Sequence, residues 1–222
     1  MLDFGWEKRN PGDVAEPVIV SGSSSFSRRE AGKMPNDKWP DIDRRQSREL
    51  LLSSERLTIG EATSADTTSI AQVEAAARSL LYPHGVDLEA IEIPVGFEES
   101  ISWDVALVAE IQGTVVGSVR SSDLGAGWLA LDQISVDPAY AQRGIGSCLL
   151  VALADRAREL GYLTITGTTF RAVPFNAPFY ADLDAAEDLT PHPVMVERRR
   201  VEQELGLDSF GPRLVMRVTI GR

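Results

Sequence analysis

A glycine-rich turn at residues 142–147, with the sequence QRGIGS, separates two segments of different periodicity. The apolar segment 128–136 before the turn has the character of a strand, and the segment after it carries an apolar stripe at helical spacing up to Gly161. The turn therefore opens a helix, whose first N–H groups are unpaired and lie at the positive end of its dipole. Such a turn predicts either a phosphate-binding site or a plain connection between strand and helix.

Two familiar nucleotide sites do not fit this turn. Gly144 and Gly146 lack Cβ atoms and so allow phosphates to approach the backbone, and Arg143 can add a charged hydrogen bond. The chain contains no Gly-Lys-Ser/Thr sequence, so it has no P-loop lysine to reach a γ-phosphate. Leu149 stands where the dinucleotide fingerprint has its third glycine. We therefore expect a phosphate-bearing ligand other than ATP or NAD.

The charge of the chain is unevenly distributed. Residues 1–54 contain nine acidic and nine basic residues, whereas residues 55–222 carry the whole net charge of −11 and no lysine. An acidic surface disfavours nucleic acids and anionic membranes as partners and favours cationic substrates. No apolar run is long enough to span a bilayer and the N-terminus does not resemble a leader, so we expect a cytoplasmic protein. Cys148 is the only cysteine, and no metal site is expected.

Residues 1–54 and 55–222 are expected to form different kinds of structure. The first segment has no sustained period, and its prolines and the serine-rich stretch 21–25 predict a mostly disordered or loosely docked extension. Trp6 and Trp39 could contact the folded domain or a second subunit. The periodic text from residue 55 onward predicts a single folded domain.

Within the folded domain, strands and helices are mixed. Alternation of apolar and polar residues predicts strands over 57–62, 103–111, 115–120, 128–136, 162–168 and 214–220. Apolar residues at helical spacing predict helices from Ser64 to Pro83, from the glycine turn to Gly161, over 176–183 and over 194–205. The basic cluster 198–200 is expected on a solvated face of the last helix. The acidic segment 84–101 is expected to form a loop beside the substrate.

The predicted strand 128–136 contains a phase change. Leu129 and Leu131 share one parity, whereas Ile134 and Val136 share the other. A β-bulge near Asp132 would bring all four side chains to one face and leave backbone groups available to a ligand. A strand buried on both faces explains the same pattern, and the sequence leaves both interpretations open.

The turn at 142–147 resembles the Gln/Arg-x-x-Gly-x-Gly/Ala turn of the GNAT superfamily of N-acetyltransferases. Asn176 and Tyr180 resemble the second signature of that superfamily, an asparagine four residues before a tyrosine on a short helix. The order of strands and helices is also similar, and the resemblance covers residues 56–222. Members often continue the second signature with Leu-Gly-Phe, whereas here Leu183 is followed by Asp184.

The resemblance implies an α+β fold of the GNAT type, with a central mixed, mostly antiparallel twisted sheet flanked by helices and a splayed, bulged fourth strand. It also implies acetyl-CoA as co-substrate. Ile134, Ser135 and Val136 would bind the pantetheine arm through their backbone, Asn176 would hydrogen-bond the same molecule, and Tyr180 would protonate the departing thiolate. The pyrophosphate would lie on the N–H groups of Gln142, Arg143, Gly144, Ile145, Gly146 and Ser147.

In such a reaction the amine attacks the thioester directly, in a ternary complex and without a covalent enzyme intermediate. A base must take a proton from the amine; we favour Asp132, with Glu110, Glu98 and Glu99 as the other candidates. The expected acceptor is a small amine, an amino acid or an amine-bearing antibiotic, and the acidic surface adds a preference for cationic acceptors. Two alternatives remain open: an acyl-CoA-binding regulatory module without turnover, and a protein or peptide N-acetyltransferase. The family is also compatible with a homodimer.

Overall fold

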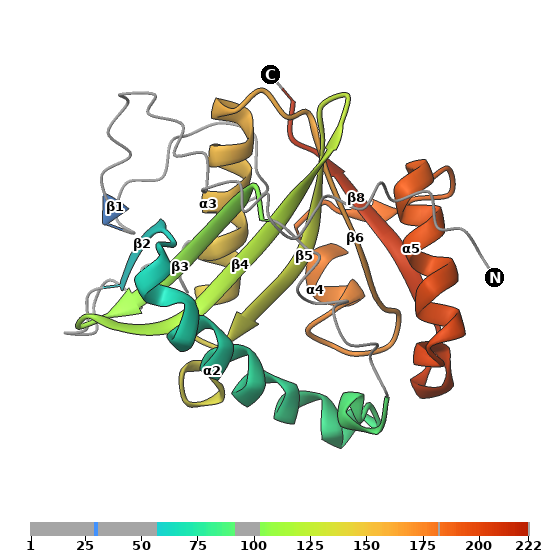
Figure 1. The fold of residues 1–222 in the computed structure, drawn as a ribbon, viewed down its shortest axis with the longest axis horizontal. Coiled ribbons are helices and arrows are strands. Elements are labelled where there is room, and N and C mark those ends of the chain that lie inside the picture. Colours follow the sequence, from blue (N-terminus) through green and yellow to red (C-terminus); the bar gives the residue numbers. More distant parts are fainter. Residues whose placement is uncertain (1–28, 31–56, 92–102, 182, 222) are drawn as a thin grey trace, which may run out of the picture.

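The computed structural model describes residues 29–30, 57–91, 103–181 and 183–221 (Figure 1). Within these residues, eight strands form one sheet in the order β1-β2-β3-β4-β5-β6-β8-β7. They are β1 (Arg29–Glu30), β2 (Leu57–Glu61), β3 (Val105–Ile111), β4 (Thr114–Gly125), β5 (Trp128–Val136), β6 (Thr164–Phe170), β7 (Ala186–Glu187) and β8 (Arg213–Thr219). The helices are α2 (Thr67–Arg78), α3 (Ile145–Glu159), α4 (Ala177–Ala181) and α5 (Pro193–Glu204). Short 3-10 helices are η1 (Ser64–Asp66), η2 (Ser79–His84), η3 (Leu88–Ala90), η4 (Pro138–Tyr140) and η5 (Leu207–Phe210).

The sheet is mixed and mostly antiparallel, as the sequence predicts. β5 and β6 run parallel, and every other pair of neighbouring strands is antiparallel. Of the expected N-terminal extension, Arg29 and Glu30 are described and form the edge strand β1, which pairs with β2. The other residues of 1–54 and the segment 92–101 lie outside the described residues, so the expectations for them stay predictions.

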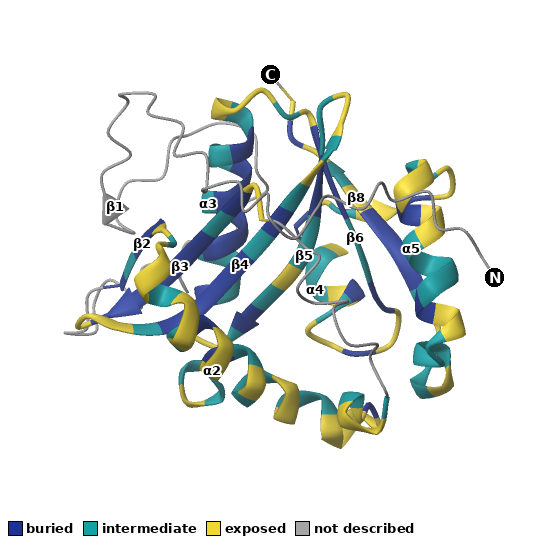
Figure 2. Ribbon diagram, in the orientation of Figure 1, coloured by how far each residue is buried: buried dark blue, intermediate teal, exposed yellow. Residues whose placement is uncertain are grey.

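Helices cover both faces of the sheet. Leu149 of α3 is fully buried in the main apolar cluster, against side chains from the central strands. On the opposite face, Glu74 of α2 binds Arg120 of β4, and Met195 of α5 packs against Ala130 of β5. In Figure 1, α3 lies behind β3 and β4, whereas α2 crosses in front of the sheet. Figure 2 shows that the central strands are mostly buried, while α2 and α5 keep exposed outer faces.

A β-bulge interrupts β5 at the position that the sequence indicates. Gln133 pairs with Arg120 and Leu131 pairs with Ser121, so Asp132 is the extra residue of β5 opposite β4. The bulge absorbs the change of parity: Leu129, Leu131, Ile134 and Val136 all pack against the main apolar cluster on the α3 face. The interpretation of a bulge is therefore confirmed. The strand is also buried on both faces where it pairs with β6, since Leu129 and Ala130 are both fully buried.

Beyond the bulge, β5 and β6 separate. Their parallel pairing joins Trp128–Ala130 to Thr164–Thr166 and extends no further. Residues 131–136 of β5 and 167–170 of β6 do not pair with each other, and we call these two stretches the β5–β6 fork. Gly167 stands where the two strands part, and a Cβ on it would lie 3.0 Å from the Leu131 carbonyl oxygen. The splayed strand is thus confirmed, and a glycine at the branch point allows the two backbones to meet before they diverge.

Several boundaries differ by a few residues from the sequence prediction, and for two of them the local cause is clear. The first helical segment is capped by Thr63 and not by Ser64, because the Thr63 N–H donates to the Asp66 carboxylate at 2.8 Å. The strand expected from residue 162 begins at Thr164, because the N–H of Tyr162 bonds a carbonyl at the end of α3. Both shifts arise from local hydrogen bonds, which the periodicity of apolar residues does not indicate.

Candidate active site

The glycine-rich turn presents unpaired backbone donors at the start of α3. Gly144 caps the helix in the left-handed region with φ of 77°, and Gln142 also has a positive φ of 60°. The first hydrogen bond of the helix runs from the Cys148 N–H to the Gly144 carbonyl at 3.0 Å. The N–H groups before it have no helical carbonyl to bond; they belong to Ile145, Gly146 and Ser147. The positive end of the helix dipole lies at the same place, so the turn has the geometry of an anion site.

The two sequence motifs meet in space. A Cβ built on Gly146 would lie 3.6 Å from Cζ of Phe179 in α4 and 3.9 Å from Cγ2 of Val136 in β5. Phe179 in turn contacts the ring of Tyr180, with 5.5 Å between the ring centroids. The end of β5, the glycine-rich turn and α4 therefore surround one place in the molecule.

Backbone groups of β5 face the fork. Asp137 donates its N–H to β4 at 2.9 Å, and the carbonyl of Ser135 lies against β4 as well. Because the backbone groups of successive residues point to alternate sides of a strand, those of Ile134 and Val136 point away from β4. β6 does not pair with this part of β5. Of the three residues predicted to hold a pantetheine arm, Ile134 and Val136 are thus in position, whereas the backbone groups of Ser135 point to β4.

Tyr180 keeps its phenolic proton over the physiological pH range. Its ring packs against the main apolar cluster and against Leu214 and Met216 of β8. Burial raises the pKa of Tyr180 to about 12, with the charge of Arg213 acting in the opposite direction. A phenol with this pKa is protonated at neutral pH, so Tyr180 can act as a hydrogen-bond donor and acid and not as a base.

The other residues predicted to bind the co-substrate lie around the same turn. Asn176 precedes α4, and its carbonyl accepts the Tyr180 N–H at 3.0 Å. Within the part of the chain that the structure describes, its side-chain amide has no hydrogen-bond partner and remains available to a ligand. Gln142 and Arg143 are exposed. The Arg143 guanidinium lies 5.2 Å from the centroid of the Tyr140 ring, and its Nη2 donates to the Ala139 carbonyl at 3.4 Å.

Asp132, the residue favoured as base, is already paired. Its Oδ1 accepts from Nη1 of Arg198 in α5 at 2.7 Å, and its side chain is 5% exposed. Its Oδ2 is buried and has no hydrogen-bond partner among the described residues. Arg198 occupies Oδ1, so an amine can reach this oxygen only after Arg198 has moved.

The alternative bases are not brought to the fork. Glu110 is buried in β3, two strands away from β5 in the order of the sheet. Glu98 and Glu99 lie outside the described residues. The base role of Asp132 therefore stays a prediction, with Arg198 as a condition that the sequence did not reveal.

The basic cluster 198–200 is only partly solvated, so the prediction of a solvated face was wrong for two of its three residues. Arg200 fits it, since its side chain is 41% exposed and pairs with Glu197. Arg199 is 13% exposed and binds Glu202 and Asp208. Arg198 turns inward to Asp132, which lies 66 residues earlier in the chain. The missed signal is the spacing of Met195, Arg198 and Glu202, which places the three on one face of α5.

A second charged group lies at the β6 edge of the fork. Glu202 is buried and accepts hydrogen bonds from Thr168 of β6, from Arg199 and from Arg213 of β8. Burial acts to raise the pKa of Glu202, but the charge of Arg213 and these hydrogen bonds outweigh it and hold the pKa below its ordinary value. Glu202 is therefore an anion that ties α5 to the two strands.

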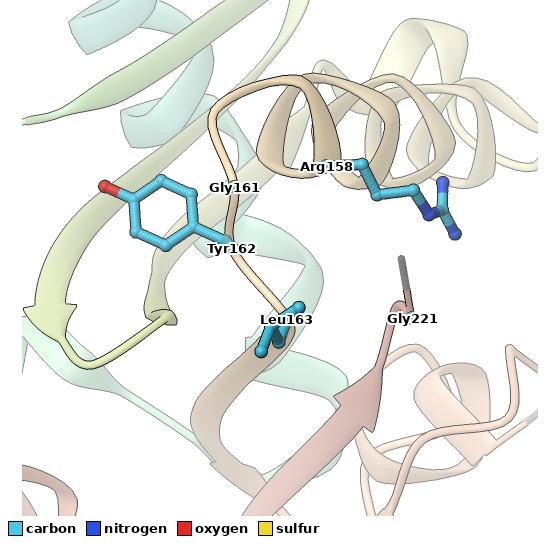
Figure 3. A pocket seen from close by; sticks show the side chains of 5 residues that line it. All are labelled: Arg158, Gly161, Tyr162, Leu163 and Gly221. Carbon is cyan, nitrogen blue, oxygen red and sulfur yellow. The ribbon is translucent and has the colours of Figure 1, made fainter.

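A shallow pocket lies elsewhere in the molecule. Figure 3 shows it between the C-terminal end of α3 and the end of the chain, lined by Arg158, Gly161, Tyr162, Leu163 and Gly221. The 15 residues of α3 separate it from the glycine-rich turn by about 22 Å. It is therefore too far away to share in chemistry at the turn. Among the described residues, no three His, Cys, Asp or Glu side chains gather as metal ligands, and no helix could cross a membrane.

Comparisons with known proteins gave one family match and several solved structures of similar fold. Residues 75–183 match the model of the acetyltransferase (GNAT) family. No match was found among curated proteins.

Three solved structures are similar to the chain. N-acetylglutamate synthase from Neisseria gonorrhoeae, complexed with coenzyme A and N-acetyl-glutamate, is 20% identical with a TM-score of 0.55; the match covers 75% of this chain and 35% of that one.

The other two structures are shorter proteins that the match covers almost entirely. The ribosomal-protein-S18-alanine N-acetyltransferase from Escherichia coli is 17% identical, with 75% of this chain and 95% of that one covered and a TM-score of 0.51. PaiA N-acetyltransferase from Thermoplasma acidophilum, in complex with coenzyme A, is 15% identical, with 73% and 98% covered and a TM-score of 0.50. At these identities, the likeness concerns the fold.

Proposed function

Since the chain carries an acetyltransferase domain of the GNAT family, matched over residues 75–183, we propose that it transfers the acetyl group of acetyl-CoA to the amine of a small acceptor. One observation carries the proposal: Gly146 of the glycine-rich turn lies beside Val136 of β5 and Phe179 of α4, and Phe179 contacts the ring of the protonated Tyr180. Two of the proteins similar in fold were crystallised with coenzyme A, which supports acetyl-CoA as the co-substrate here.

Different residues would bind the different parts of acetyl-CoA, according to the chemistry of each part. The first-turn N–H groups of α3 would bind the pyrophosphate, and Arg143 stands close enough to add charge. Ile134 and Val136 would pair with the amide groups of the pantetheine arm, as a further strand would. An N–H on this edge would also polarise the thioester carbonyl. The side-chain amide of Asn176 would bond the same arm.

Proton transfer accompanies two bond changes, formation of the N–C bond and cleavage of the C–S bond. An ammonium acceptor first loses one proton to a base, for which we retain Asp132. As the amine attacks the carbonyl carbon, Tyr180 gives its proton to the departing sulfur. The second amine proton then restores Tyr180, which regains it readily because its pKa is about 12. The products are an amide and a free thiol.

The proposal is tested by isothermal titration of acetyl-CoA into the full-length protein, with coenzyme A and NADH as comparison ligands. We expect both coenzyme A compounds to bind with a Kd on the order of micromolar and NADH not to bind. Release of thiol in the presence of a panel of amines and N-terminal peptides then identifies the acceptor class. Absence of coenzyme A binding would overturn the proposal.

The remaining outcomes separate the alternatives. Binding without thiol release from any acceptor indicates a regulatory module, and release with peptides alone indicates a protein N-acetyltransferase. The latter is the activity that the name of the Escherichia coli protein states, which is why peptides belong in the panel. A cytoplasmic location and a homodimer stay parts of the prediction.

A further inference from the structure

The pair of Asp132 and Arg198 lies on the face of the fork opposite to Tyr180. Met195, Arg198 and Glu202 form the inward stripe of α5; they contact Ala130 and Asp132 of β5 and Thr168 of β6 in turn. Helix α5 therefore follows the fork on one face of the sheet. Tyr180 packs against the apolar cluster of the other face. If Tyr180 protonates the leaving sulfur from its own face of the sheet, the amine arrives from the opposite face, where Asp132 and Arg198 lie.

Both members of this pair have unused hydrogen-bonding capacity. In the part of the chain that the structure describes, Asp132 uses Oδ1 alone, and its buried Oδ2 has no partner. Leaving such a buried atom unsatisfied is destabilising, so it calls for a reason. Arg198 makes one hydrogen bond within the described residues, although a guanidinium has five N–H donors, and it is 25% exposed. By contrast, Arg213 makes three hydrogen bonds to Glu202 and Thr168.

Charge balance decides which acceptor suits this pair. A purely cationic amine would take the place of Arg198 on Asp132 and leave the guanidinium beside it without an anion. A purely anionic molecule would draw Arg198 away and leave a buried carboxylate unpaired, which is strongly destabilising. An acceptor that carries a carboxylate next to its ammonium satisfies both groups, because each charge of the pair exchanges one partner for another.

We propose that Asp132 and Arg198 select a zwitterionic acceptor of the amino-acid class, whose carboxylate binds Arg198 and whose ammonium binds Asp132. This inference rests on the proposed acetyl transfer and names the acceptor of the same site. The carboxylate of the acceptor draws Arg198 off Asp132, and Asp132 is then free to take the ammonium proton. Arg198 is thus the residue that makes the base available only when the correct acceptor is present. The acidic surface alone had favoured a plain cationic amine, and the local pair overrides it.

The test uses matched acceptors with the full-length protein at saturating acetyl-CoA. Each common amino acid is compared with its primary amide and with the amine that lacks the carboxyl group, by the rate of thiol release. For the best amino acid, we expect kcat/KM to exceed that of its amide by tenfold or more. Wild-type protein that turns over both acceptors equally would overturn the inference and leave acetyl transfer itself intact.

Variants at Arg198 separate recognition from a structural role. Arg198→Gln should abolish the preference for the amino acid over its amide, with the ratio falling close to one. Arg198→Lys keeps the charge and should keep part of the preference. Arg200→Gln is the matched control, since Arg200 lies on the outer face of the same helix, and it should leave the ratio unchanged. An equal loss of activity with both acceptors in Arg198→Gln would contradict recognition.

A binding measurement keeps the inference testable where a variant is unstable or slow. The double variant Asp132→Asn, Arg198→Gln replaces both charges by neutral groups that can still hydrogen-bond each other. Calorimetric titration of the amino acid into the coenzyme A complex should show binding to wild-type protein and at least tenfold weaker binding to the double variant. Unchanged binding would overturn the inference. Failure of wild-type protein to bind coenzyme A at all would instead count against the proposed function.

Discussion

The two sides of the β5–β6 fork are built from different interactions. On the side of α4, Tyr180 and Phe179 pack against apolar side chains, and the glycine-rich turn offers backbone donors. On the side of α5, charged side chains dominate, with Asp132 held by Arg198 and Glu202 held by Arg213. A pantetheine arm and a thioester are uncharged and need shape and backbone groups, whereas an amine changes charge as it reacts. The apolar side thus suits the uncharged parts of the co-substrate. The charged side suits the amine, whose charge changes in the proposed reaction.

Removal of the Tyr180 hydroxyl should have the largest effect on activity. Tyr180→Phe keeps the ring that packs against the apolar cluster and deletes the proton donor. We expect kcat to fall by about 10²–10⁴ while the Kd for acetyl-CoA changes little. Tyr162→Phe, at the far end of α3, is the control and should leave kcat unchanged. An equal loss of affinity for acetyl-CoA and of kcat would assign Tyr180 to binding and would contradict its proposed role as the acid.

On the charged side, Glu202→Gln should have the largest effect on stability. The substitution leaves Arg213 and Arg199 facing a neutral partner in a buried place, and we expect a loss of about 3 kcal/mol in the free energy of unfolding. Because the pKa of Glu202 is lowered in the folded protein, its contribution is complete above the unfolded pKa of about 4.3 and is lost as the pH falls through the folded pKa.

Urea unfolding at a series of pH values measures this contribution. The difference between wild-type protein and Glu202→Gln should be constant near neutral pH and shrink below about pH 4. Glu204→Gln is the matched control, because Glu204 lies exposed on the outer face of α5, and it should change stability by less than about 0.5 kcal/mol. A pH-independent difference would show that shape, and not charge, is what Glu202 supplies.

The same contrast explains which features the sequence could predict. Glycines and the parity of apolar residues are local signals, and they located the turn at 142–147 and the bulge at Asp132. Charged side chains carry no such apolar period, and the only sequence signal that separates the inward Arg198 from the outward Arg200 is the spacing of Arg198 from Met195 and Glu202. Their partners are fixed by the way α5 lies on the sheet, which joins residues far apart in the chain. The apolar side of the fork was therefore predictable and the charged side was not.

Gly167 tests whether the branch point of the fork depends on close backbone contact. Gly167→Val would place a branched side chain against the Leu131 carbonyl, since even a Cβ would approach to 3.0 Å. We expect a loss of about 1–3 kcal/mol in the free energy of unfolding, with Gly167→Ala losing less. Thermal unfolding of the two variants measures the difference. If both are as stable as wild-type protein, β5 and β6 are not held together as closely as their geometry indicates.

The smallest effect is expected at Asp184, which stands where the resembled GNAT signature often has a glycine. Asp184 has a φ of 59°, in the left-handed region, directly after the turn in which the Leu183 N–H bonds the Tyr180 carbonyl. The glycine usual in the family suits that conformation, whereas an aspartate tolerates it at a cost. We therefore expect Asp184→Gly to stabilise the protein by about 0.5 kcal/mol and Asp184→Ala to destabilise it by about the same amount. Because Asp184 is exposed and closes the segment that carries Tyr180, kcat should stay unchanged in both variants. A lower kcat in Asp184→Gly, despite higher stability, would mean that the strained turn helps to hold Tyr180 in place. The apolar side of the fork would then depend on backbone strain as well as on packing.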